Sequence, residues 1–112
     1  MFGNGYIYST VTGPRMPHYI VLGNWTDQGI RNIKDSPKRA QDFRNTVEKS
    51  GGKVSEIYYT MGKHDFVAIL EVSNDEAVMS VLLSLGSKGN VRTTTLKGFP
   101  ISEAEKIVTN LS

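Results

Sequence analysis

Two runs of consecutive apolar residues constrain the fold of this chain most. Residues 19–23 read Tyr-Ile-Val-Leu-Gly and residues 66–70 read Phe-Val-Ala-Ile-Leu. Successive side chains of a β-strand point to opposite faces of the sheet, so both runs are apolar on both faces. Helices that cover one face leave the other without cover, and an exposed apolar face of this kind normally marks an interface. The runs therefore predict central strands of a sheet that buries its second face by self-association.

Helix signals separate these strands from two others. The pattern predicts strands over residues 18–25, 53–60, 65–72 and 91–98, and helices over 36–50, 74–85 and 102–111. A loop is expected up to Asp35, after which Ser36 is expected as the N-cap of a helix and Pro37 as its first residue. Capping boxes are expected at Ser73–Glu76 and Ser102–Glu105, where serine and glutamate satisfy each other's free amides.

The resulting order, β-α-β-β-α-β followed by a tail helix, is typical of the ferredoxin-like arrangement. Right-handed crossovers make this an α+β fold with a four-stranded antiparallel sheet and both long helices on one face. Pairing of the free sheet faces would give a dimeric α/β barrel. The alternative is that the tail helix and the N-terminal arm cover that face within one chain.

The length of 112 residues allows one domain, and its first fifteen residues differ from the rest. Residues 1–15 are glycine-rich and carry one charge, and we interpret them as an N-terminal arm or a non-native extension. The domain then spans residues 16–112. An alternative is that residues 6–11 add an edge strand to the sheet.

Composition excludes several classes of function. The chain has no cysteine, which removes disulfides, thiolate nucleophiles and cysteine metal sites and indicates a cytoplasmic protein. No apolar run approaches the roughly 20 residues that span a bilayer, so no membrane association is expected. A net charge of +2 is too small and scattered for nucleic-acid binding. No metal-ligand spacing is present, and we expect neither a metal nor a cofactor.

Three segments resemble the GYD-domain family, and together they span most of the chain. They are residues 16–30 with 34–37, then 59–69, and then 85–96. The resemblance implies a small bacterial or archaeal protein with a ferredoxin-like, dimeric α/β-barrel fold and no established reaction. His64 stands where the family usually has tyrosine, so a role of that ring in the family does not carry over.

Topology predicts one end of the sheet as the candidate ligand site. The end of the first strand, the turn between the middle strands, the start of the last strand and the start of the first long helix meet there. The candidate residues are Asn24, Trp25, Ser36, His64, Asp65 and Arg92. Aromatic and polar groups that converge in this way suit a small aromatic or anionic ligand.

Each candidate also has a structural interpretation. Trp25 can be a packing anchor, Asp65 can bind local backbone amides, Arg92 can pair with Asp65, and His64 can simply be solvated. Lys38 and Arg39 lie in the first turn of a helix, against the helix dipole. They either point into solvent or help to hold an anionic ligand or partner.

Three functions remain open at this point. The favoured one is a homo-oligomeric module that binds a small molecule or has a regulatory role. The second is a cofactor-independent enzyme of the monooxygenase or isomerase type, which rests on analogy of fold and in which His64 or Asp65 would act as general base. The third is a purely structural assembly protein.

Overall fold

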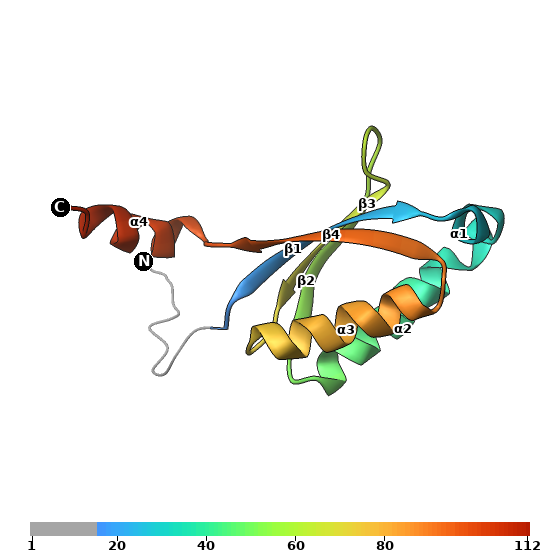
Figure 1. Cartoon of the computed structure of the whole chain (residues 1–112), viewed down its shortest axis with the longest axis horizontal. Helices are drawn as coiled ribbons and strands as arrows, with labels where there is room; N and C mark the ends of the chain where they lie inside the picture. The colour runs from blue at the N-terminus through green and yellow to red at the C-terminus, as the bar shows by residue number, and fades with distance from the viewer. Residues whose placement is uncertain (1–15) are drawn as a thin grey trace.

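The computed structural model describes residues 16–112, so the arm and the alternative edge strand expected within residues 1–15 lie outside the described residues. The elements are β1 His18–Trp25, α1 Asp27–Arg31, a 3₁₀-helix Ile33–Asp35, α2 Ser36–Lys49, β2 Lys53–Tyr59, β3 Phe66–Glu71, α3 Asp75–Ser87, β4 Val91–Gly98 and α4 Ile101–Thr109. Figure 1 shows these elements in chain order.

The four strands form one antiparallel sheet in the order β2-β3-β1-β4. β1 and β3 are the central strands, as the two apolar runs predict. In the register, Gly23 of β1 lies opposite Phe66 of β3 and Thr93 of β4. The sheet and its helices confirm the ferredoxin-like α+β prediction.

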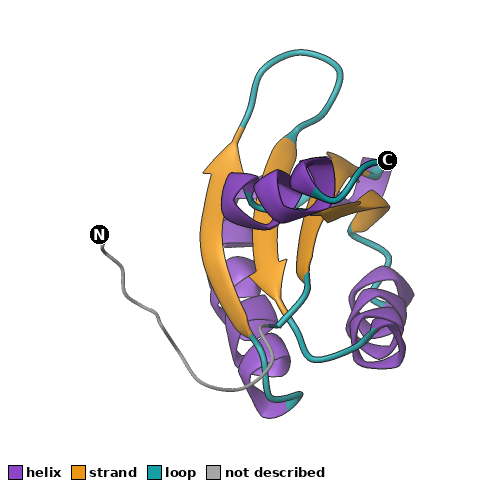
Figure 2. Cartoon of the chain, turned by 90° about the vertical axis from the view of Figure 1, so that its left-hand side faces the viewer, coloured by secondary structure: helices purple, strands orange, loops and turns teal. Residues whose placement is uncertain are grey.

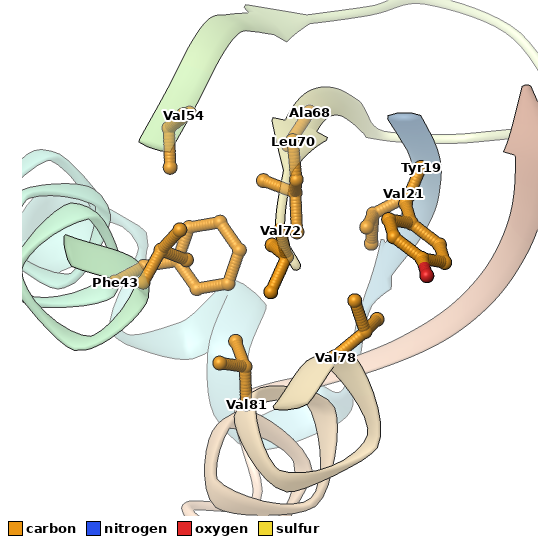
Figure 3. Packing of buried hydrophobic residues seen from close by; sticks show 10 residues of the cluster. Tyr19, Val21, Phe43, Val54, Ala68, Leu70, Val72, Val78 and Val81 are labelled. Carbon is orange, nitrogen blue, oxygen red and sulfur yellow. The ribbon is translucent and has the colours of Figure 1, made fainter. Parts of the chain in front are cut away.

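Helices α2 and α3 cover one face of the sheet, here called the helix face (Figure 1). Phe43 of α2 and Val81 of α3 point toward the strand side chains of the core (Figure 3). The core strand residues include Tyr19, Val21, Ala68 and Leu70. These alternate positions of β1 and β3 are all buried, because every second side chain of a strand points to the same face.

The segment expected as a loop before α2 is largely helical, and that prediction is wrong. α1 begins after Thr26, whose side-chain oxygen accepts a hydrogen bond from the backbone N–H of Gly29 at 3.1 Å. Such a side-chain cap satisfies one of the free amides at a helix start. A 3₁₀-helix then leads directly into α2, so Ser36 is the first residue of α2 rather than its cap.

The two predicted capping boxes are also wrong in detail. The cap of α3 is Asn74, whose Oδ1 accepts from the N–H of Ala77 at 2.8 Å, so the capping residue lies one position after Ser73. α4 begins at Ile101, directly after Pro100, and no side chain caps it. Asparagine competes well with serine for a cap position because its side chain reaches the same amides.

The opposite side of the sheet, here called the open face, has no helix over it. Its central side chains are Ile20, Leu22, Val67 and Ile69, all partly exposed. α4 extends away from the sheet beyond the end of β4 (Figure 1), and none of its residues is buried. The described residues therefore leave the open face uncovered, and α4 does not provide the cover considered as the alternative.

Candidate functional site

Strand alternation divides the predicted site residues between the two faces of the sheet. Tyr19, Val21 and Gly23 point to the helix face, so Trp25 does too, while Asn24 lies on the open face. Arg92 lies opposite Asn24 in the β1–β4 register and shares the open face. The predicted site is thus two different places at the same end of the sheet.

The β2–β3 loop is held against β1 by hydrogen bonds of Asn24, His64 and Asp65. The Asn24 amide donates to the Lys63 carbonyl at 2.9 Å, and its Oδ1 lies 3.1 Å from His64 Nδ1. The Asp65 carboxylate accepts from the backbone N–H of Trp25 at 2.9 Å. Asp65 therefore binds a backbone amide, which is the structural role weighed for it from the sequence.

The loop that these bonds anchor stands clear of the sheet (Figures 1 and 2). Met61 at its tip is 99% exposed, and Gly62 has a φ of 106° that favours glycine. Thr60 closes the base of the loop, because its N–H donates to the Asp65 carbonyl at 2.9 Å. The anchored base and exposed tip make this loop a projecting feature.

Arg92 is exposed and forms no hydrogen bond or ion pair with any residue in the described part of the chain. It does not pair with Asp65. The structure therefore does not gather Arg92 with Trp25 and Ser36.

Trp25 belongs to an aromatic cluster on the helix face. Its ring lies 5.2 Å from the ring of Phe66 and 5.7 Å from that of Tyr59, the latter edge-on at 75°. The Tyr59 hydroxyl is hydrogen-bonded to the hydroxyl of Ser36, which is buried in the first turn of α2. Phe66 packs over the backbone of Gly23, where a β-carbon would lie only 2.0 Å from the ring. Glycine is therefore needed at this position.

Beside this cluster lies a cavity of about 80 Å³ between α2, α3 and the sheet, here called the inter-helix hollow. The strands contribute Trp25, Ile57, Tyr59, Phe66 and Ala68 to its lining. The helices contribute Ser36, Ala40, Phe43, Val81, Ser84 and Leu85. An apolar cavity with a few polar groups at one side is the usual form of a small-molecule site.

Polar residues surround one side of the hollow. Arg39, Asp42 and Asn90 line both the hollow and a shallow polar depression that adjoins it. Lys88 lines the hollow and is exposed. Asp42 is itself paired with Lys38, at 3.7 Å across one helical turn. The apolar interior therefore opens toward groups of both charge signs.

Hydrogen bonds from the start of α1 hold the segment before β4 in place at this side of the hollow. The N–H and hydroxyl of Thr26 donate to the carbonyls of Asn90 and Gly89, at 3.1 and 2.6 Å. The Gln28 amide donates to the Lys88 carbonyl at 3.0 Å. Gly29 allows this approach, because a β-carbon there would lie 2.0 Å from the Asn90 carbonyl oxygen.

Arg39 completes the same network from α2. Its guanidinium donates to the Asn32 carbonyl at 2.9 Å and to the Gly29 carbonyl at 3.4 Å. The first-turn position opposes the helix dipole, and these carbonyls at the end of α1 offset that effect. Lys38 points outward to Asp42, so the two cations singled out in the sequence have different surroundings.

Tyr19, Asp75 and Lys97 form a hydrogen-bonded group at the far end of the sheet. Tyr19 donates to Asp75 Oδ1 at 2.5 Å, and Lys97 Nζ lies 3.3 Å from the same oxygen. Burial, followed by the bond to Asp75, raises the pKa of Tyr19 to about 12. The Tyr19 and Lys97 bonds lower the pKa of Asp75. This group ties α3 to β1 and β4 and does not reach the hollow.

Of the residues predicted from the sequence, Trp25 and Ser36 line the hollow, and most of the other lining residues are not among those predicted. Asn90 directly precedes the last strand, and Arg39 stands out in the sequence only for its charge. Tyr59 and Phe43 follow ordinary strand and helix patterns, which carry no signal of a cavity. Among the described residues, no group of three or more histidine, aspartate or glutamate side chains could hold a metal ion. No described helix has the length and apolar character to cross a bilayer.

A four-stranded antiparallel sheet in the order β2-β3-β1-β4, with two helices on one face, defines a ferredoxin-like α+β domain. The family model for the GYD domain matches residues 19–108, and the chain belongs to this family. A protein of Thermus thermophilus, named glutamine synthetase and cystathionine beta-lyase binding protein, is 33% identical over 89 residues. The match covers 79% of this chain and 94% of that protein.

Two solved structures share the fold. MtbAldR matches with a TM-score of 0.63 at 14% identity, covering 86% of this chain and 60% of that one. A feast or famine regulatory protein from M. tuberculosis, complexed with L-methionine, matches with a TM-score of 0.61 at 18% identity, covering 87% and 58%. The chain thus spans about three-fifths of the length of these two proteins. At these identities the likeness shows the fold alone.

Proposed function

We propose that this protein is a homo-oligomeric regulatory module that binds a small molecule in the inter-helix hollow. The observation that carries the proposal is the hollow itself, an apolar cavity of about 80 Å³ between two helices and a sheet. The hollow opens toward solvent beside the exposed Lys88 and Ser84. An apolar group that enters it leaves water and contacts the apolar lining, which favours binding.

The uncovered open face supports the oligomeric part of the proposal. Ile20, Leu22, Val67 and Ile69 leave an apolar strip on two central strands, and Leu96 of β4 is 49% exposed beside it. Removing apolar surface from water stabilises an association by about 25 cal/mol per Å² before the entropic costs of binding. Sheet-to-sheet pairing would give the dimeric α/β barrel expected from the sequence.

We propose that the module acts by binding a protein partner. The Thermus relative is named for its binding to two enzymes, glutamine synthetase and cystathionine beta-lyase. We propose that this chain likewise docks on a metabolic enzyme, and that the bound small molecule alters this docking. The cytoplasmic location predicted from the cysteine-free sequence suits such a partner.

Native mass spectrometry of the purified protein tests ligand binding. We expect a retained small molecule, which is lost when Ala40→Leu fills the hollow from α2. Gln41→Leu, which places a leucine on the exposed side of α2, is the matched control and should keep the molecule. An unliganded protein whose Trp25 fluorescence responds to no compound of a metabolite library would overturn the proposal.

Light scattering tests self-association. We expect at least a dimer at micromolar concentration, and a monomer after Leu22→Asp places a carboxylate on the open face. Lys34→Asp, at an exposed site outside the sheet, is the control for added negative charge. A monomeric native protein would contradict the oligomeric part of the proposal.

A further inference from the structure

We propose that the ligand of the inter-helix hollow is a small carboxylic acid with a short aliphatic tail. The tail occupies the apolar interior, and the carboxylate lies at the polar side between Arg39 and Lys88. This inference rests on the proposed function, because it names the class of molecule that the hollow takes.

The volume of the hollow limits the apolar part of the ligand. An apolar cavity of about 150 Å³ accepts benzene, and the hollow measures about 80 Å³. A branched aliphatic group of roughly four carbons suits this space better than an aromatic ring. The lining by Phe43, Phe66 and Leu85 offers that group no hydrogen-bonding partner. Of the two ligand types predicted from the sequence, aromatic and anionic, this proposal keeps the anionic one and gives it an aliphatic tail.

The side chains of Arg39 and Lys88, two cations at the polar side of the hollow, favour a carboxylate as the polar end of the ligand. The Arg39 guanidinium has five N–H donors, and two of them are held by the backbone carbonyls of Asn32 and Gly29. These bonds fix the plane of the guanidinium and leave other donors for an anion. The Lys88 side chain has no hydrogen bond or ion pair within the described residues.

The position of these cations is set by the fold rather than by chance. The Lys88 carbonyl accepts from Gln28, and the carbonyls of Gly89 and Asn90 accept from Thr26, so the segment that carries Lys88 is fixed to α1. Arg39 holds the C-terminal end of the same helix. One short helix thus places both cations beside the hollow.

Asp42 decides whether the acid also carries an ammonium group. Its carboxylate lies at the same side of the hollow and is paired, within the described residues, with the exposed Lys38 at 3.7 Å. Such an exposed pair is weak and can exchange for a ligand cation. An α-amino acid and a simple carboxylic acid share the proposed chemistry, and binding of matched compounds distinguishes them.

The test uses Trp25, the single tryptophan of the chain, as a fluorescent probe within the hollow. The full-length protein is titrated with 4-methylpentanoate, with leucine and with the neutral alcohol 4-methylpentan-1-ol. We expect saturable binding of one or both acids, at least tenfold tighter than that of the alcohol. Tighter binding of leucine indicates contact with Asp42, and Asp42→Asn should then remove the preference.

Variants of the two cations complete the test. Arg39→Gln and Lys88→Gln should each weaken binding of the acid by about tenfold, because each removes a charged donor. Arg39→Gln also removes the hydrogen bonds to the Asn32 and Gly29 carbonyls and can loosen α1. Lys88→Gln keeps those bonds, so it tests the charge alone. Lys49→Gln, at the exposed far end of α2, should leave the affinity unchanged.

The outcomes separate this inference from the proposed function. The inference is wrong if the alcohol binds as well as the acids, or if Lys88→Gln and Arg39→Gln bind normally. The proposed function then still stands where native mass spectrometry finds another molecule that Ala40→Leu displaces. Both fall if the purified protein retains no compound and its Trp25 fluorescence responds to none.

Discussion

The two faces of the sheet are built from the same kinds of residue and differ in what covers them. In β1 and β3, Val21, Ala68 and Leu70 on the helix face are at most 1% exposed. Their neighbours Leu22 and Ile69 on the open face remain partly exposed. Hydrophobicity alone therefore does not decide burial in this chain. The helices decide it, and the open face keeps an apolar surface that a second molecule can use.

The largest expected difference between the faces comes from truncating adjacent residues of β3. Leu70→Ala should lower the free energy of unfolding by about 2–5 kcal/mol, because it leaves a cavity in the core. Ile69→Ala should cost less, and its cost should depend on protein concentration, because mass action links self-association to stability. Chemical denaturation at two protein concentrations measures both. Equal costs that are independent of concentration would remove the distinction between the faces.

Gly23 on the helix face and Gly98 on the open face differ in how much space a β-carbon would have. Gly23→Ala places a β-carbon 2.0 Å from the Phe66 ring on the helix face and should cost about 1–3 kcal/mol. Gly98→Ala meets only the flexible end of Ile20, at 3.1 Å, and should change stability by less than about 0.5 kcal/mol. Thermal unfolding monitors both variants. A tolerated Gly23→Ala would show that the aromatic cluster repacks freely.

Tyr19 on the helix face makes the free energy of unfolding depend on pH in the alkaline range. Its pKa is raised from 10.0 to about 12, so the native state keeps the proton that the unfolded chain releases. The resulting stability is present below pH 10 and is lost as the pH rises from about 10 to 12. Denaturation between pH 9 and 12 should show this decline, and Tyr19→Phe should flatten it. A Tyr19→Phe protein with the same alkaline decline would contradict the assignment.

The smallest expected effect concerns two adjacent threonines of β4. The hydroxyl of Thr95 is buried on the helix face without a hydrogen-bond partner in the described structure, whereas Thr94 is exposed. Thr95→Val should stabilise the protein by about 0.5–1 kcal/mol, because it removes an unsatisfied polar group. Thr94→Val should have no such effect. Urea denaturation of the two variants compares them directly, and a destabilised Thr95→Val would indicate a bound water or ligand at that hydroxyl.

Most of the fold could be predicted because its signals are local. The apolar runs at 19–23 and 66–70 identify the central strands, and Gly51 and Gly52 mark the end of α2. α1 escapes prediction for a physical reason. Gly29 resembles a turn residue in the sequence, but its missing β-carbon serves a close approach to Asn90, which lies far along the chain. A local pattern cannot show that contact.

The candidate site could be predicted only in part because topology identifies an end of the sheet and not a face. Asn24 and Trp25 are adjacent in one strand and therefore point to opposite faces, a conflict that the sequence already contains. The cavity between Ala40, Phe43 and Leu85 depends on how far α2 and α3 lie apart. That spacing is a tertiary property with no signature in either helix.

The strand order also has a consequence during synthesis. Among the described strands β1 is made first, but it lies between β3 and β4, so neither of its neighbours in the sheet is present until residues 66–98 follow. At translation rates of about 5–20 residues per second, this delay is on the order of several seconds. During that time Tyr19–Leu22 is an apolar, uncharged strand with two free edges, the kind of segment that aggregates or recruits a chaperone. The central position gives β1 two hydrogen-bonded neighbours in the native protein, and it leaves both edges of β1 unpaired on the nascent chain until those neighbours are made.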